Sequence, residues 1–220
     1  PITTQDVVDK LVERLIKSRL DAKKDKNIIH RRQLLSYSIY GEKNPASDIL
    51  TPSELKKIKQ EELIELINSL PSYSHRILYY GNKDRKSLTS LLKKYHKIPL
   101  KFLEIKNKIK KYQEKDYKKN YVFWTNFDMV QTEIILLSRL EPLDNEKTAA
   151  INLFNQYFGG GMNSIVFQEI REAQGLAYAV FSNYSQASKT DRSDYLLSYV
   201  GVQNDKQSEA LSSMFWLINE

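Results

Sequence analysis

Apolar side chains recur every three to four positions in several stretches of the chain, which is the spacing of a helix that buries one face. The clearest stretch is 51–73, where Thr51 is a suitable N-cap, Pro52 takes the first helical position and Glu54 completes a capping box. We expect one long helix there, ended by Pro71. Further helices are expected over residues 6–20, 27–40, 84–97, 144–158, 163–174 and 204–220.

Other stretches are rich in β-branched and aromatic residues, or alternate apolar with polar positions, and these patterns predict strands. The predicted strands cover residues 75–82, 121–125, 130–140, 176–185 and 194–203. No strand–helix–strand rhythm repeats, and several neighbouring strands are spaced like hairpins. We therefore predict an α+β fold with a mainly antiparallel sheet packed against helices. For the helix over 144–158 we expect Asp144 as the N-cap and an inward face made of Ala150, Leu153, Phe154, Tyr157 and Phe158.

The most unusual local feature is a run of three glycines, 159–161, in a chain that has only seven glycines. The run lacks the Gly-x-Gly-x-x-Gly spacing after a strand that is typical of dinucleotide sites, and no Gly-Lys-Ser/Thr follows it as in a P-loop. We expect instead that Gly159 ends one helix in a left-handed conformation. The other two glycines would then let the chain turn back tightly into the next helix.

The net charge of +7 comes from a single segment. Residues 93–119 hold eleven lysines against three acidic residues, a local excess of +8, and the rest of the chain is close to neutral. Nucleic-acid-binding proteins usually spread basic residues over one face of the fold. We interpret the segment as a solvated linker, 97–119, between the parts 1–96 and 120–220, with no nucleic-acid partner. Nucleic-acid binding through 93–119 is the alternative, and it requires an affinity that falls steeply with salt.

Composition also limits the chemistry of the chain. The absence of cysteine excludes disulfides, thiolate metal sites and a cysteine nucleophile, and it is compatible with either a periplasmic or a cytoplasmic location. His30, His75 and His96 are scattered, so we expect no metal or cofactor in this chain. No apolar run is long enough for a membrane span. Residues 1–10 have no signal-peptide pattern and no initiator methionine, and we expect the chain to be a piece of a longer protein.

Arg171 and Tyr178 are the candidate functional residues. Arg171 lies one turn before Gly175, which is expected to end a helix, and Tyr178 follows three residues after that glycine on the outgoing strand. A helix that reverses through glycine into a strand can bring both side chains to one place. A guanidinium and a phenol are hydrogen-bond donors suited to a carbonyl or a developing oxyanion. The structural alternative pairs a surface Arg171 with Glu172 or Glu169 and places Tyr178 in the core.

The stretch 153–180 closely resembles the signature of the pitrilysin-like, or insulinase-family, zinc metallopeptidases. The resemblance rests on the glycine run and on Ser164, Phe167, Glu169, Arg171, Gly175, Leu176, Ala177 and Tyr178. Weaker similarity extends over residues 50–220, and residues 1–49 carry no motif of the family.

The resemblance implies a metallopeptidase half-domain. In that family two homologous α+β halves enclose a chamber, and one half bears the zinc motif His-x-x-Glu-His. The partner half offers an arginine and a tyrosine that bind the peptide and support the transition state. By resemblance, Arg171 and Tyr178 are that pair, residues 1–96 close one half, and residues 120–220 open the next. Zinc, a zinc-bearing half on the same or a separate chain, and a peptide substrate are then the expected partners. The alternative is a structural subunit without peptidase activity, like the respiratory-chain core proteins.

Overall fold

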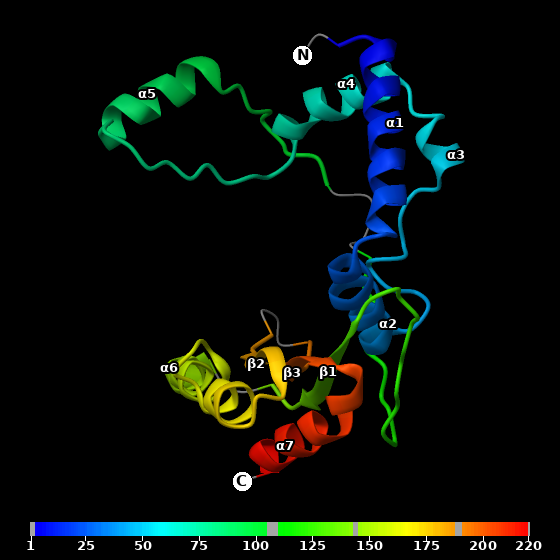
Figure 1. Ribbon diagram of the computed structural model, residues 1–220. Helices are drawn as coiled ribbons and strands as arrows, with labels where there is room; N and C mark the ends of the chain where they lie inside the picture. The colour runs from blue at the N-terminus through cyan, green and yellow to red at the C-terminus, as the bar shows by residue number, and fades with distance from the viewer. Residues whose placement is uncertain (1–2, 105–109, 143–144, 188–190, 220) are drawn as a thin grey trace. The chain divides into compact units, whose positions relative to one another are not determined.

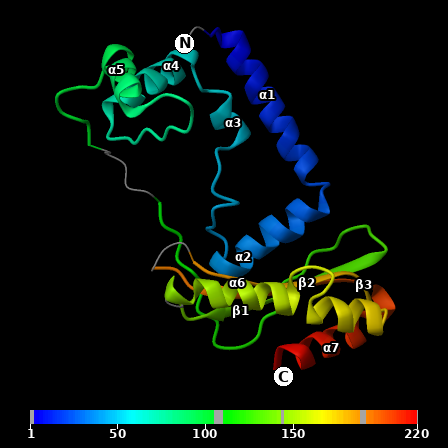
Figure 2. The ribbon, with the colours of Figure 1, turned by 90° about the vertical axis from the view of Figure 1, so that its left-hand side faces the viewer.

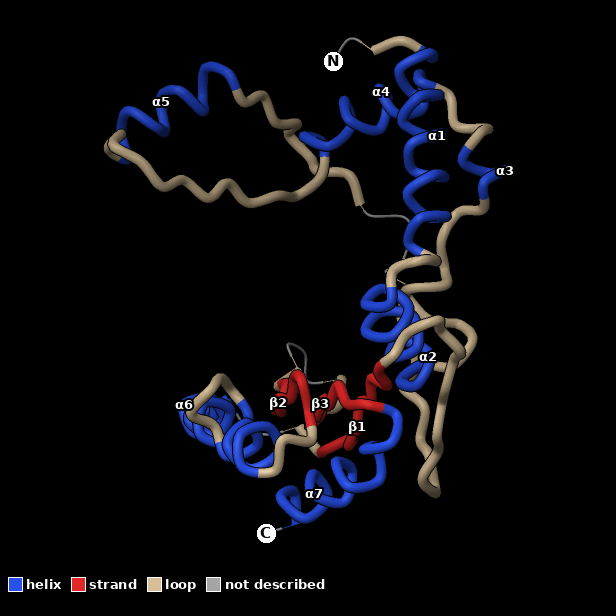
Figure 3. Tube along the Cα trace, in the orientation of Figure 1, coloured by secondary structure: helices blue, strands red, loops and turns tan. Residues whose placement is uncertain are grey.

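The computed structural model describes residues 3–104, 110–142, 145–187 and 191–219, and the chain divides into two compact units, Pro1–Phe123 and Trp124–Glu220 (Figure 1). In its described residues the first unit consists of helices joined by long loops, and the second combines helices with a sheet (Figure 3). The assignment of residues 1–96 and 120–220 to two successive half-domains stays a prediction. No described helix is both long and apolar enough to cross a membrane.

The first unit packs its longest helix, α1 (Gln5–Ala22), against a short one, α3 (Pro52–Leu55). Val8 and Val12 of α1 meet Leu55 of α3 in a small buried core. The other helices of this unit are η1 (Ile28–Leu34, π-helical), α2 (Leu35–Tyr40), α4 (Gln60–Ser69), η2 (Leu70–Ser72, 3₁₀) and α5 (Arg85–Tyr95). The helices expected over 6–20, 27–40 and 84–97 are therefore confirmed.

The single helix expected over 51–73 is wrong, because the chain breaks between α3 and α4. The predicted capping box is present, with the Thr51 amide donating to Glu54 Oε2 (2.7 Å) and the Glu54 amide to Thr51 Oγ1 (3.3 Å). The break is stabilised from α1. There the Gln5 side chain donates to the Ile58 carbonyl (3.2 Å) and accepts from the Gln60 amide (2.9 Å). A side chain more than fifty positions away thus satisfies the backbone groups that the break leaves free.

The strands expected over 75–82 and 121–125 are also wrong. A strand needs a neighbour for its backbone groups, and the only pairing described near the first segment is an isolated parallel bridge between Tyr73 and Leu103. Residues 75–80 are accordingly exposed. In the second segment, Tyr121 and Phe123 join an aromatic cluster with Tyr37 and Tyr117 instead.

The described part of the lysine-rich segment is exposed but anchored within the first unit. The Lys115 amide donates to the Ile39 carbonyl at 2.8 Å, at the end of α2. Tyr112 Oη donates to Asp48 Oδ2 at 2.5 Å, and Lys110 forms an ion pair with the same oxygen. These two partners lower the pKa of Asp48, the bond from Lys110 having the larger effect. Residues 110–119 are therefore held along α2 and the loop that follows it.

The second unit is built on a three-stranded antiparallel sheet with the order β1-β3-β2, made of β1 (Gln131–Leu140), β2 (Ala177–Ser185) and β3 (Asp194–Gln203). The α+β prediction and the three strands expected over 130–203 are confirmed. Figure 2 shows α6 (Thr148–Phe154) and its π-helical continuation η4 (Asn155–Gly159) running alongside the sheet. The remaining helices are η3 (Asn145–Lys147, 3₁₀), η5 (Phe167–Ala173, π-helical), η6 (Asn204–Lys206, 3₁₀) and α7 (Gln207–Asn219).

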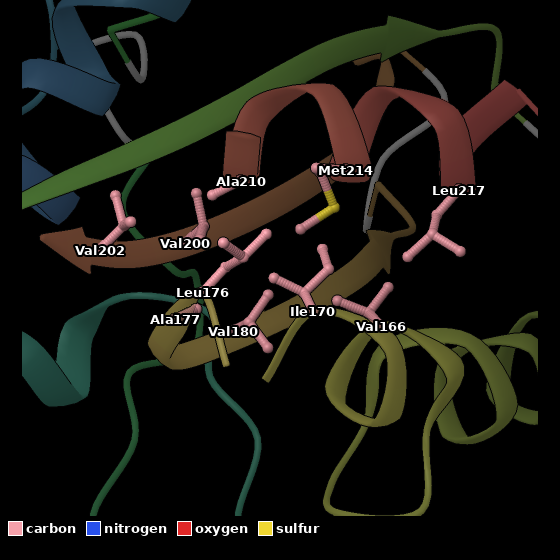
Figure 4. Packing of buried hydrophobic residues seen from close by; sticks show 10 residues of the cluster. All are labelled: Val166, Ile170, Leu176, Ala177, Val180, Val200, Val202, Ala210, Met214 and Leu217. Carbon is pink, nitrogen blue, oxygen red and sulfur yellow. The ribbon is translucent and has the colours of Figure 1, made fainter. Parts of the chain in front are cut away.

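The core of the second unit lies where β2, β3, η5 and α7 meet (Figure 4). Val166 and Ile170 from the helix around η5 belong to one buried cluster with residues of both strands and with Met214 of α7, and all three are fully buried. The full set is Val166, Ile170, Leu176, Ala177, Val180, Val200, Val202, Ala210, Met214 and Leu217.

The inward face expected for 144–158 is wrong in part. Ile151 is the buried residue of α6, and of the expected face only Phe158 packs against the core. Leu153 and Tyr157 are 71% and 66% exposed, and Ala150 and Phe154 are exposed as well. The π-helical winding that begins at Asn155 changes the phase of the helix from that residue on, so a regular 3.6-residue period does not describe the segment that holds Tyr157. The expected N-cap Asp144 lies outside the described residues.

Candidate functional site

The three glycines lie where the chain turns back from η4 towards η5. A different physical constraint explains the glycine at each of the three positions. Gly159 is buried against β2, and a Cβ placed on it would lie 2.2 Å from the carbonyl oxygen of Ser182. A Cβ on Gly160 would lie 2.6 Å from the carbonyl oxygen of Asn155. Gly161 has φ +94° and open space around it. The left-handed residue is therefore Gly161, and the expectation that Gly159 takes this conformation is wrong.

Ser164 starts the next helix directly after this turn. Its buried hydroxyl donates to the Gly161 carbonyl (2.8 Å) and accepts from the Phe167 amide (3.4 Å). This is the bonding of an N-cap residue, which satisfies an amide that the first helical turn leaves free. The glycine turn and Ser164 together fix the direction in which the helix that carries Arg171 leaves.

That helix ends at Gly175 in a left-handed conformation, with φ +63°. The Gly175 amide donates to the Arg171 carbonyl (3.1 Å), and the Leu176 amide donates to the Ile170 carbonyl (3.0 Å). Since η5 is π-helical, its last turn is wider than an α-helical turn, and such turns are frequent at functional sites. Arg171 thus lies in the last turn before the reversal, as the sequence predicted.

Tyr178 lies at a β-bulge just after the reversal. Ala177 pairs with Val202 and Ala179 pairs with Gly201, so Tyr178 is the extra residue of β2 at this point. The bulge turns the strand locally, and the Tyr178 side chain is 58% exposed. The alternative that places Tyr178 in the core is therefore wrong.

The Arg171 side chain is 44% exposed and rests against two neighbours. Its Cζ lies 4.7 Å from the centroid of the Phe167 ring, and its Nε lies 3.7 Å from Glu172 Oε1. The alternative pairing with Glu172 is thus present, at a distance too long for a hydrogen bond. Arg171 and Tyr178 flank the same glycine reversal, and no hydrogen bond between their side chains is found among the residues described.

The far end of β2 is fixed by polar contacts. The Asn155 side chain donates to the Tyr184 carbonyl (2.9 Å) and accepts from the Tyr184 amide (2.6 Å). It thus binds both backbone groups of one β2 residue, as the backbone of a paired strand does. Tyr184 Oη donates to the buried Asp194 at 2.9 Å. Burial and this bond raise the pKa of Tyr184 to about 12. The strand that carries Tyr178 is therefore tied to η4 and to β3.

The residues that the structure describes hold no group that fits a catalytic zinc ion. Within the described ranges, no three His, Asp or Glu side chains lie close enough to hold a metal. The structure does bring together two histidines that are far apart in the sequence, His75 and His96, whose Nε2 atoms are 2.7 Å apart. His75 precedes the segment that contains α5, and His96 directly follows α5. Only their positions on either side of α5 could have indicated this contact.

Comparison with known proteins decides the family. Residues 53–220 match the family model described as the peptidase M16 inactive domain. The chain belongs to this family. The resemblance to zinc metallopeptidases is thereby confirmed. An uncharacterised zinc protease of Mycobacterium leprae is 42% identical over 55 residues, which is 25% of this chain and 12% of that protein. An uncharacterised zinc protease of Rickettsia felis is 42% identical over 82 residues, 37% of this chain and 19% of that protein.

Solved structures of similar fold cover nearly all of this chain. The peptidase M16 inactive domain from Pseudomonas fluorescens has a TM-score of 0.69 at 16% identity, covering 100% of this chain and 52% of that one. A ferredoxin protease in complex with Arabidopsis ferredoxin has a TM-score of 0.64 at 13% identity, covering 98% of this chain and 23% of that one. The chain thus spans about half of the Pseudomonas fluorescens structure, and less than a quarter of the ferredoxin protease and of the two zinc proteases.

Proposed function

We propose that this M16 inactive domain is the non-catalytic half of a zinc-dependent endopeptidase that acts on peptides or unfolded segments. The observation that carries the proposal is the pair of exposed donors, Arg171 and Tyr178, on either side of the Gly175 reversal. The names of the relatives as zinc proteases support the same class. A homologous zinc-bearing half, on the same or a separate chain, would supply the metal chemistry.

The role of the pair follows from its chemistry. A guanidinium and a phenol donate hydrogen bonds and supply no acid or base near neutral pH, so they suit the carbonyl of a bound peptide. Donors aimed at a carbonyl oxygen bind it more strongly as negative charge develops on it. Arg171 has several N–H groups and would also bind the peptide carbonyl in the ground state. Tyr178 would contribute mainly as charge develops.

The test uses the parent protein with its zinc-bearing half present, and it compares Tyr178→Phe with Tyr157→Phe. Both tyrosines are more than half exposed in the second unit, but Tyr157 lies on η4, outside the proposed pair. Tyr178→Phe should lower kcat about a hundredfold, equivalent to about 3 kcal/mol, while Tyr157→Phe leaves kcat unchanged. Arg171→Ala should raise KM as well as lower kcat.

Melting curves measured in parallel separate this role from a structural one. The proposal expects the melting temperature of Tyr178→Phe to stay close to that of the wild type, because the ring is kept and the hydroxyl is exposed. A lowered melting temperature with intact turnover would indicate a structural residue. Full activity in both Tyr178→Phe and Arg171→Ala would refute the proposed role and favour a subunit without a peptidase function.

A further inference from the structure

We propose that Phe167 is a positioning residue for Arg171, and that its ring holds the guanidinium in place before a peptide arrives. The functional part of this inference rests on the proposed role of Arg171. Phe167 and Arg171 are four positions apart on one helix, so their side chains are neighbours on its surface. The 4.7 Å between Arg171 Cζ and the ring centroid lies within the range of a cation–π contact.

Phe167 is a fixed platform because the core holds it. The residue is half-buried and packs against the cluster that contains Val166 and Ile170, both fully buried. Its amide is tied to the N-cap Ser164. Arg171 is 44% exposed. The contact therefore joins a constrained ring to a side chain that would otherwise sample many rotamers.

The kind of contact matters as much as its presence. A guanidinium that rests on an aromatic ring uses its flat face and keeps its N–H edges free for an acceptor. A bidentate ion pair would occupy those edges. The ion pair with Glu172 is long, with 3.7 Å between Arg171 Nε and Glu172 Oε1, and lies between two exposed side chains, where such pairs contribute little. The ring is therefore the stronger orienting contact, and it leaves the donors available to a peptide.

The first experiment measures the contact itself by NMR on the 220-residue chain. In the wild type, the Arg171 side-chain protons should be shifted upfield by the ring, and the Nε–Hε group should have restricted motion. Phe167→Leu keeps an apolar side chain in the core but removes the ring, so both signatures should disappear. Phe167→Tyr should retain them. Phe158→Leu is the matched control, because Phe158 packs against the same core. Unchanged Arg171 signals in Phe167→Leu would overturn the proposal.

The second experiment measures the consequence in the parent protein with its zinc-bearing half. Phe167→Leu should lower kcat/KM about threefold to tenfold, mostly through KM, with recovery in Phe167→Tyr and no such loss in Phe158→Leu. If Arg171→Ala is impaired and Phe167→Leu is not, the positioning role is refuted while the proposed function stands. If Arg171→Ala is fully active, the proposed function itself fails, and the NMR result still decides whether the ring holds Arg171.

Discussion

Gly159→Ala is the sharpest test of why the chain places a glycine run between two helices. The added Cβ would lie 2.2 Å from the oxygen and 2.4 Å from the nitrogen of Ser182, where ordinary contact begins at 3.4 Å. Both atoms belong to the backbone of β2, so no side chain can rotate away. The π-helical segment η4 and β2 must separate by about 1 Å, which weakens every contact between them. We expect a loss of about 3 kcal/mol or more in the free energy of unfolding.

The assay is thermal unfolding followed by tryptophan fluorescence. Trp124 and Trp216 are the two tryptophans of the chain, and both belong to the second unit. The expected loss lowers the melting temperature of this unit by roughly 12 °C or more. Gly161→Ala is the matched control two positions away, because its Cβ would meet nothing within 4 Å. Only its left-handed backbone is strained, which costs about 1–2 kcal/mol. If Gly159→Ala were no more destabilising than Gly161→Ala, the close approach to β2 would not be the reason for the glycine.

Further outcomes are expected for other features. The pKa of Tyr184 is raised to about 12, so the stability from its bond to Asp194 is fully present below pH 10 and is lost as the pH rises through 12. The free energy of unfolding of the wild type should therefore exceed that of Tyr184→Phe by about 1–3 kcal/mol near pH 8. Urea unfolding followed by tryptophan fluorescence should show this difference shrinking above pH 11. The pKa of Asp48 is lowered by Lys110, so their contact is present above about pH 4 and is lost as the pH falls further. Asp48→Asn should speed trypsin cleavage after Lys110, read by mass spectrometry, and an unchanged cleavage order would show that Asp48 does not hold the segment. Metal analysis of the dialysed chain should find well under one zinc per molecule; a retained one-to-one content would contradict the assignment of zinc to a partner half.

The elements that could be predicted correctly are those whose sequence signals are local. The strands at 130–140, 176–185 and 194–203 carry β-branched and aromatic residues in apolar runs or alternation, which favours a strand, and all three are present. Thr51 and Glu54 made their capping box, because both partners lie within one turn. Gly175 ended its helix in the left-handed conformation for the same reason. Arg171 and Tyr178 were placed on either side of that reversal by their spacing alone.

The features that could not be predicted depend on contacts with residues far away in the sequence. The helix expected over 51–73 breaks because Gln5, far away in sequence, binds the free backbone groups at the break. The apolar stretch 75–82 is no strand, because a strand exists only beside a neighbour. Gly159 is required by the backbone of Ser182, a contact that no local pattern encodes. The exposure of Tyr178 follows from a bulge opposite Gly201, which depends on how two strands pair. Local rules select conformations over a few residues, whereas packing selects which of them can share space and hydrogen bonds.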